Sequence, residues 1–182
     1  MKKMTTATDD EILSTFRKNP DEGFALLMQA YSEPVYWNIR RMVVGHEDAQ
    51  DVAQETFVRI YSALHDFKGK SQLKTWIYRI ATNEALRFLQ SRRQETLSDE
   101  QQQADLLARL QDSEYVNYDE VLTIRFQQAV LQLPEKQRVV FNLRYYDELD
   151  YQSIHEITGE NVSTLKSNYH WAKEKIKQYM LS

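Results

Sequence analysis

Apolar residues recur at helical spacing along most of the chain, and short breaker segments divide the pattern. The first long stretch follows Pro20 and predicts a helix over residues 22–44. Pro34 lies inside this stretch, so we expect a kink or a break there, and we expect Gly45 to end the helix. The apolar positions that define the stretch are Phe24, Leu27, Met28, Tyr31, Val35 and Ile39.

Two more helices are predicted before the middle of the chain. Residues 48–64 place Ala49, Val52, Ala53, Phe57, Ile60, Tyr61 and Leu64 on one face and polar residues on the other. Residues 65–73 have the composition of a loop, and residues 74–94 return to a helical pattern. In that second helix a polar, basic stripe is predicted from a four-residue recurrence, made of Thr75, Arg79, Asn83 and Arg87.

The composition becomes acidic over residues 96–122, which hold seven acidic residues and one basic residue. We interpret this segment as an acidic linker, partly disordered or marginally helical. Helices are predicted again over residues 120–133, 135–146 and 151–158. A final helix starts near Ser163, which we expect to be its N-cap, and runs to the end of the chain.

Composition supports an all-α protein. The 182 residues include only four glycines and three prolines, which makes turn-rich β folds and phosphate-binding glycine loops improbable. We therefore predict two small helical domains, residues 1–94 and 119–182, joined by an acidic linker over residues 95–118. No cysteine is present, which excludes a disulfide scaffold and thiolate zinc sites.

Targeting signals are missing from the pattern as well. The chain has no apolar run of about 18 residues, and its N-terminus continues into Asp9, Asp10 and Glu11 in place of an apolar stretch. We expect a soluble cytoplasmic protein without membrane insertion.

A helix-turn-helix is the first candidate motif. Residues 151–158, Gly159 and the helix after it have the spacing of this motif, with a shared core predicted from Ile154, Ile157, Val162 and Leu165. The side chains that would then reach a DNA major groove are Ser163, Thr164, Lys166, Ser167 and His170. Spacing alone does not separate a DNA-binding motif from an ordinary helical hairpin.

A basic segment with interleaved aromatic residues is the second candidate. Residues 66–94 contain seven basic and two acidic residues, and the aromatic residues among them are Phe67, Trp76, Tyr78 and Phe88. Cations and aromatic rings together suit single-stranded nucleic acid. The competing interpretation is that Trp76 and Phe88 are core and that the charges form a solvated face. For the aromatic residues alone that interpretation is favoured, but the cluster of charge is harder to explain by it.

The third candidate is an acidic face on the predicted helix 48–64. Asp48, Asp51, Gln54 and Glu55 could bind a basic partner helix or could simply be solvated, and the pattern alone favours solvation. The four histidines show no metal-ligand spacing, and no residue is marked as a nucleophile on a strained turn. We expect no enzymatic activity, no cofactor, no metal and no small-molecule substrate.

The formal charge of −4 argues, taken alone, against nucleic-acid binding. That total averages over opposite segments, because residues 147–160 hold five acidic residues and no lysine or arginine. Residues 161–182, by contrast, hold four lysines and one glutamate. With a Debye length of roughly 8 Å, distant acidic segments barely weaken a local basic patch. The acidic total therefore excludes only a protein that coats DNA by charge alone.

These three candidates, in this order, resemble the sigma factors of bacterial RNA polymerase. The string from Asp48 to Tyr61, then Phe67, then the string from Lys74 to Asn83 is similar to sigma region two. The string Leu133-Pro-Glu-Lys-Gln-Arg-Val-Val-Phe141, with the helix-turn-helix after it, resembles region four. Because no other domain is present, the chain resembles the small extracytoplasmic-function (ECF) group of the sigma-70 family.

The resemblance implies roles for all three surfaces. The acidic segment would dock on the clamp helices of core RNA polymerase, through Asp48, Asp51, Gln54, Glu55 and Phe57. The basic-aromatic segment would melt the minus-ten element of promoter DNA and hold one strand, through Phe67, Lys68, Lys70, Lys74, Trp76, Tyr78, Arg79, Asn83 and Arg87. The last helix would read the minus-thirty-five element, through Ser163, Thr164, Lys166, Ser167, His170 and Lys173.

The chain departs from the family pattern around the helix-turn-helix. His155 stands where the family usually has a small residue, Thr158 and Glu160 stand where it has apolar residues, and Trp171 stands where arginine is common. Family members are often inhibited by an anti-sigma factor, of which the sequence gives no direct sign. Two alternatives remain: a helix-turn-helix regulator that acts without core polymerase, and a protein-binding adaptor in sigma regulation.

Overall fold

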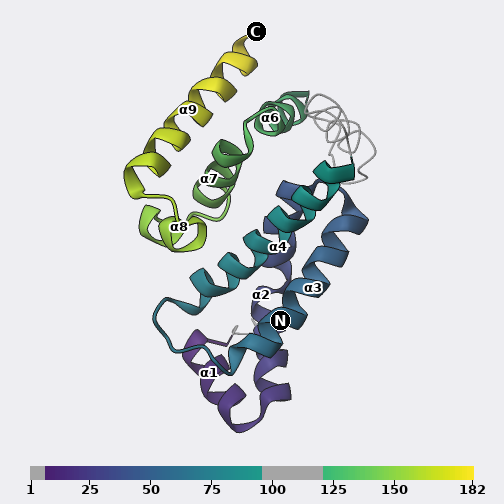
Figure 1. Ribbon diagram of the computed structural model, residues 1–182, viewed down its shortest axis with the longest axis vertical. Coiled ribbons are helices and arrows are strands. Elements are labelled where there is room, and N and C mark those ends of the chain that lie inside the picture. Colours follow the sequence, from purple (N-terminus) through teal and green to yellow (C-terminus); the bar gives the residue numbers. More distant parts are fainter. Residues whose placement is uncertain (1–6, 96–120) are drawn as a thin grey trace, which may run out of the picture.

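The computed structural model describes residues 7–95 and 121–182, and all regular structure in these ranges is helical (Figure 1). The predicted linker over residues 95–118 lies, apart from its first residue, outside the described residues. The helices α1 to α4 form one group, and α6 to α9 form a second group that packs beside it. The all-α prediction is confirmed.

Helix α1 (Asp9–Lys18) was not predicted, although the sequence contains the residues that cap its N-terminus. Thr8 and Glu11 form a capping box, in which the Glu11 side chain accepts from the Thr8 N–H at 2.8 Å and Thr8 accepts from the Glu11 N–H at 3.3 Å. Ile12 and Phe16 are buried against α2 (Pro20–Val43). Gly23 of α2 permits this contact, because a Cβ there would lie 2.2 Å from the Cα of Phe16.

The structure of α2 differs from the prediction at Pro34 and at the end of the helix. The helix is continuous through Pro34, so no break occurs there. It ends at Val43, and Val44 follows as its C-cap with a positive φ of 65°, a value more typical of glycine. Gly45 instead has a φ of −66° and serves as the N-cap of α3 (His46–Leu64).

The helices that carry the candidate site are α3 and α4 (Leu73–Glu95), which pack on α2 and on each other. The predicted apolar face of α3 is buried, apart from Tyr61, which lies at the surface and donates a hydrogen bond to Asp21. A loop joins the two helices and turns at Gly69, whose φ is 68°.

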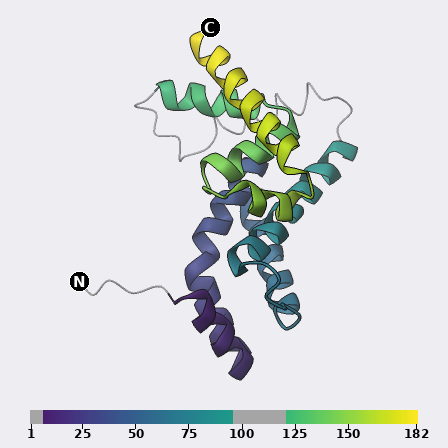
Figure 2. The ribbon, with the colours of Figure 1, turned by 90° about the vertical axis from the view of Figure 1, so that its left-hand side faces the viewer.

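The C-terminal group consists of α6 (Val121–Leu131), α7 (Glu135–Tyr145), α8 (Tyr151–Thr158) and α9 (Val162–Leu181). Phe141 and Ala172 belong to a cluster that α6, α7 and α9 share. The other apolar side of α7, α8 and α9 joins the core of the N-terminal group, so the two predicted domains share one buried cluster. Figures 1 and 2 show the C-terminal group seated at the end of the molecule away from α1.

Candidate functional site

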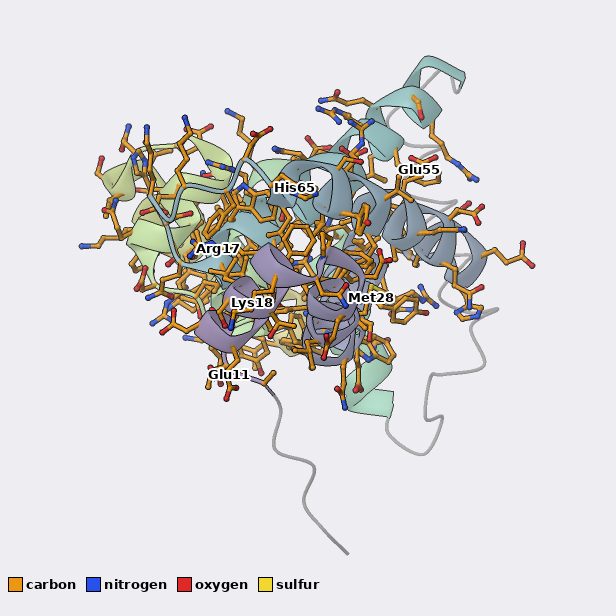
Figure 3. All side chains as sticks on the ribbon, turned by 90° about the horizontal axis from the view of Figure 1, so that it is seen from below. Glu11, Arg17, Lys18, Met28, Glu55 and His65 are labelled. Carbon is orange, nitrogen blue, oxygen red and sulfur yellow. The ribbon has the colours of Figure 1, made fainter. Side chains whose placement is uncertain are left out.

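The outer face of α3 matches the acidic surface predicted from the sequence only in part. Asp51, Gln54 and Glu55 are exposed, and Figure 3 shows Glu55 on α3 from the α1 end of the molecule. Phe57, by contrast, is 7% exposed and belongs to the core, so it cannot contact a partner in this conformation. Asp48 accepts a hydrogen bond from Arg92 of α4 at 2.9 Å and so links two helices.

Val58 is the residue on this face that the sequence analysis missed. It is 63% exposed and stands seven positions after Asp51, which puts both residues on the same side of the helix. This spacing could have identified it, because an apolar residue at a polar position of an amphipathic helix is a candidate contact. The face therefore combines carboxylates with one exposed apolar side chain.

A buried carboxylate joins α3 to α4. Glu84 of α4 is 6% exposed and pairs with Arg59 of α3, whose Nε lies 3.0 Å from the Glu84 Oε1. The same oxygen accepts from Arg87, one turn along α4. Arg59 and Arg87 keep more than half of their side chains exposed, so Glu84 orients two surface cations.

The basic stripe of α4 is confirmed in three of its four positions. Arg79, Asn83 and Arg87 are exposed at successive four-residue steps. Lys68 and Lys70 are exposed in the loop before the helix. Thr75, the fourth predicted member, is buried and its hydroxyl donates a hydrogen bond to Ser153 of α8 at 3.5 Å.

The aromatic residues of this segment do not form an exposed stacking platform. Trp76 is buried and packs against the half-buried Phe67, with ring centroids 5.2 Å apart. Tyr78 is also buried, and burial, followed by the nearby Asp147 carboxylate, raises the pKa of its hydroxyl. The predicted contacts of Trp76 and Tyr78 with DNA therefore do not fit this conformation, because both rings are inside the protein.

The helix-turn-helix is present at the predicted place. Asp150 caps α8 by accepting from the Ser153 N–H at 2.7 Å, and this backbone hydrogen bond lowers the pKa of the Asp150 carboxyl. Asn161, not Ser163, caps α9 by accepting from the Thr164 N–H at 2.9 Å. The predicted shared core is confirmed for Ile154, Ile157 and Leu165, which are buried, whereas Val162 is only half-buried.

Polar residues that depart from the family pattern form the turn between α8 and α9. His155 Nδ1 donates to the Glu160 carbonyl at 2.8 Å, and the Thr158 hydroxyl accepts from the Glu160 N–H at 3.3 Å. The Glu160 carboxylate pairs with Lys136 of α7 at 2.6 Å. Gly159, at a φ of 74°, takes the left-handed position that this turn requires. Hydrogen bonds to the turn backbone thus replace the apolar packing expected there.

The outer surface of α9 is polar and basic, as predicted. Most of the predicted contact residues are exposed, and only Thr164 is half-buried: Ser163, Thr164, Lys166, Ser167, His170 and Lys173. Trp171 is 56% exposed beside His170, with ring centroids 5.3 Å apart. The Lys173 ammonium lies 4.9 Å from the ring centroid of Tyr169, so its position is partly fixed by the aromatic face.

Two searches of the described residues bear on other functions. Among residues 7–95 and 121–182 no group of three or more potential His, Cys, Asp or Glu ligands is found. Within the same ranges, no helix combines the length and apolar character that crossing a membrane demands.

Comparison with protein families assigns both halves of the chain. Residues 27–95 match the family model described as Sigma-70 region 2, and residues 123–176 match Sigma-70, region 4. The ECF RNA polymerase sigma-E factor of Escherichia coli strain K12 is 32% identical over 177 residues, covering 93% of this chain and 92% of that protein. The chain belongs to the ECF sigma factors of the sigma-70 family. The ECF sigma factor SigW of Bacillus subtilis is similar at 28% identity, covering 90% of this chain and 92% of its own.

Solved structures agree with the fold of this ECF sigma factor. The sigma factor RpoE from Bartonella quintana, solved with the anti-sigma factor NepR, matches with a TM-score of 0.68 at 20% identity. That match covers 86% of this chain and 96% of RpoE. CnrH, solved with the cytosolic domain of CnrY, matches with a TM-score of 0.67 at 17% identity, covering 93% and 95% of the two chains.

Family membership establishes the general function. The protein is a non-enzymatic sigma factor that works with RNA polymerase and promoter DNA to direct transcription initiation. Family membership also excludes the two alternatives that the sequence left open, a helix-turn-helix regulator that acts without core polymerase and a protein-binding adaptor.

Proposed function

We propose that this ECF sigma factor divides its work among the outer faces of α3, α4 and α9. The observation that carries the proposal is that Asp51 and Glu55 of α3 and Arg79 and Asn83 of α4 are exposed on adjacent, mutually packed helices. One region-two domain thus presents an acidic face and a basic face side by side. The domain limits proposed are residues 1–94 and 119–182, with the linker at 95–118.

The acidic face of α3 is the proposed binding site for core polymerase. Asp51, Gln54 and Glu55 provide charge and hydrogen-bond acceptors, and Val58 provides an apolar contact that would be desolvated on docking. Asp48 contributes by orienting Arg92. Phe57 supports the face from beneath, as a core residue.

The basic stripe of α4 and the loop before it are the proposed minus-ten surface. Arg79, Arg87, Lys68 and Lys70 would neutralise phosphates, and Asn83 would offer a donor and an acceptor to a base. Melting requires no chemistry by the protein, since it needs only a surface that prefers unstacked bases. Phe67, which is half-buried next to Trp76, is the aromatic ring best placed to contribute in this conformation.

The outer face of α9 is the proposed minus-thirty-five reader. Lys166 and Lys173 would bind phosphates, while Ser163, Ser167 and His170 would reach base edges in the major groove. Because a linker joins the two DNA contacts, each can be weak alone and still contribute through effective concentration. We infer a cytoplasmic location, where RNA polymerase operates, and inhibition by an anti-sigma factor, as NepR is for the structural relative from Bartonella quintana.

The test is reconstitution with core polymerase from the organism that encodes the chain. Holoenzyme assembled with the purified protein should initiate at a subset of sites on fragmented genomic DNA, and sequencing the transcript ends should reveal a shared pair of promoter elements. Core polymerase without the protein is the control. Initiation at the same sites with and without the protein would refute the proposal.

A further inference from the structure

Trp171 of α9 is the most exposed tryptophan of the protein. It is 56% exposed, whereas Trp76 is buried and Trp37 is half-buried. Its ring lies beside the exposed His170, with the two ring centroids 5.3 Å apart. Tryptophan is enriched where protein surfaces meet their partners, and it often supplies much of the binding energy there. Trp171 is therefore a candidate contact residue of α9.

The position of Trp171 on the helix places it beside residues proposed to read DNA. Ser163, Ser167 and Trp171 follow one another at four-residue steps, and all three are exposed. The opposite side of α9 is buried through Leu165 and Ile176. Trp171 thus continues the polar and basic outer face of α9 and does not belong to a separate surface.

The distance along the helix decides which part of the DNA Trp171 would meet. The first residues of a recognition helix contact base edges in the major groove. Trp171 follows Ser163 by two turns, which corresponds to about 12 Å along the helix axis. The major groove is itself about 12 Å wide. A helix whose start lies at the base edges therefore brings Trp171 to the sugar–phosphate wall of the groove.

An indole ring can bind this wall without carrying a charge. Its face offers apolar surface to deoxyribose, and its Nε1–H can donate a hydrogen bond to a phosphate oxygen. A lysine that binds a phosphate displaces condensed cations from the DNA, so its contribution to affinity falls as salt rises. The neutral indole displaces none, so its contribution stays nearly constant. Lys166 and Trp171 therefore lie on one face but differ in how salt affects their contacts.

We propose that Trp171 is a further DNA-contacting residue of α9, which packs on the sugar–phosphate wall of the minus-thirty-five element and holds the helix there independently of salt. The proposal rests on the assignment of α9 to this element made above. Part of the affinity of α9 for DNA then persists at salt concentrations that weaken the contacts of Lys166 and Lys173. Trp171 sets how strongly promoter binding responds to salt, and not which bases are read.

Substitution of Trp171 in the full-length protein tests the contact. Holoenzyme binding to a promoter fragment from the transcript-end experiment is measured between about 50 and 200 mM salt. Trp171→Ala should weaken binding about tenfold at every salt concentration and leave the slope of log affinity against log salt unchanged. Affinity equal to that of the unsubstituted protein would overturn the proposal, and so would a loss that comes with a changed slope.

Two further variants examine the charge and the N–H of the contact separately. Trp171→Arg introduces a cation at the same place, so it should make the slope steeper by about one unit, with affinity regained at low salt and lost at high salt. Trp171→Phe keeps an apolar ring and lacks the N–H, so it should bind within about threefold of the unsubstituted protein. A slope that Trp171→Arg leaves unchanged would place the residue away from phosphates and overturn the proposal.

Leu181→Ala is the matched control on the same helix. Leu181 is 78% exposed at the far end of α9, so its substitution removes exposed apolar surface without touching the proposed contact. This variant should bind promoter DNA normally, and a loss equal to that of Trp171→Ala would overturn the proposal. Binding to core polymerase alone is measured for each variant. A tenfold loss there in Trp171→Ala would make Trp171 a polymerase contact and would also overturn the proposal.

Lys166→Ala separates failure of this proposal from failure of the proposed function. If Lys166→Ala lowers the salt slope and Trp171→Ala changes nothing, the role of Trp171 is refuted and the assignment of α9 stands. If neither variant changes promoter binding, the assignment of α9 to the minus-thirty-five element is refuted, and the role of Trp171 with it.

Discussion

Glu84 and Arg59 join the proposed DNA-binding helix to the proposed polymerase-binding helix through an almost fully buried carboxylate. The Glu84 Oε1 lies 3.0 Å from the Arg59 Nε and also accepts from Arg87. Replacing this carboxylate by the neutral amide of glutamine removes the charge that pairs with two guanidinium groups, each of which can still reach water. We therefore expect Glu84→Gln to lower the free energy of unfolding by about 1–2 kcal/mol, less than for a fully buried pair.

Chemical denaturation of Glu84→Gln and of Glu55→Gln measures this effect. Glu55 is exposed on α3, so its substitution should change stability by no more than about 0.5 kcal/mol. The same stability for the two variants would mean that the Glu84 network does not hold α3 and α4 together.

The polymerase-binding face of α3 can be separated from folding by charge reversal. Asp51→Arg combined with Gln54→Ala changes only exposed side chains, so the unfolding transition should stay close to that of the unsubstituted protein. Affinity for core polymerase should fall about tenfold or more, because a like charge replaces a complementary one at the interface. Glu33→Arg, an exposed reversal on α2, is the matched control and should bind normally. Unchanged affinity of the α3 variant for core polymerase would refute the proposal that this face binds polymerase.

Val58 offers a second measure of the same face without any change of charge. Its side chain is 63% exposed, so Val58→Ser should cost the free protein little stability. If Val58 is buried on docking, removing its apolar surface should weaken core binding by about 1 kcal/mol. Competition binding against the unsubstituted protein would detect this, and equal binding would place the interface elsewhere on α3.

Promoter opening should depend on the exposed residues of α4 more than polymerase binding does. Arg79→Ala combined with Asn83→Ala removes a phosphate contact and a base-edge contact from the proposed minus-ten surface. We expect open-complex formation, followed by permanganate reactivity of unpaired thymines, to fall about tenfold while core affinity changes less than twofold. Arg17→Ala on α1 is a control, because it removes one exposed cation that is not part of the proposed minus-ten surface. Equal losses in the two assays would contradict the division of roles between α3 and α4.

Local patterns predicted the helices that carry the site, because each has its own periodicity and breakers. Helix α8 lies at Tyr151–Thr158 as predicted, since Gly159 and the apolar spacing leave little choice. The cap of α9 was assigned to Ser163 although Asn161 has the required side-chain oxygen, because either residue type serves at that position. Pro34 remains within α2 because tertiary packing overrides its local preference, and Val35 directly after it is fully buried.

The packing between the domains could not be predicted in this way. The Asn38–Asp147 hydrogen bond joins residues 109 positions apart, and neither residue has a neighbourhood that marks it as buried. The burial of Trp76 and Tyr78 could not be predicted either, because the sequence of a basic segment does not show whether its aromatic residues face solvent or the core. The exposed positions Arg79, Asn83 and Arg87 of α4 could be predicted because a four-residue recurrence keeps them on one side of the helix. Thr75 belongs to the same recurrence but is covered by α8, which the local pattern does not reveal.

The salt dependence of DNA binding by α9 provides a test of the minus-thirty-five assignment. Lys166 is exposed near the start of α9, with its ammonium 5.8 Å from the ring centroid of Tyr151. Lys166→Ala should lower the slope of log affinity against log salt by about one unit if it contacts one phosphate. Lys177→Ala, at the far end of the helix, should leave the slope unchanged. Holoenzyme binding to promoter fragments measures both, and equal slopes for the two variants would contradict the proposed orientation of α9.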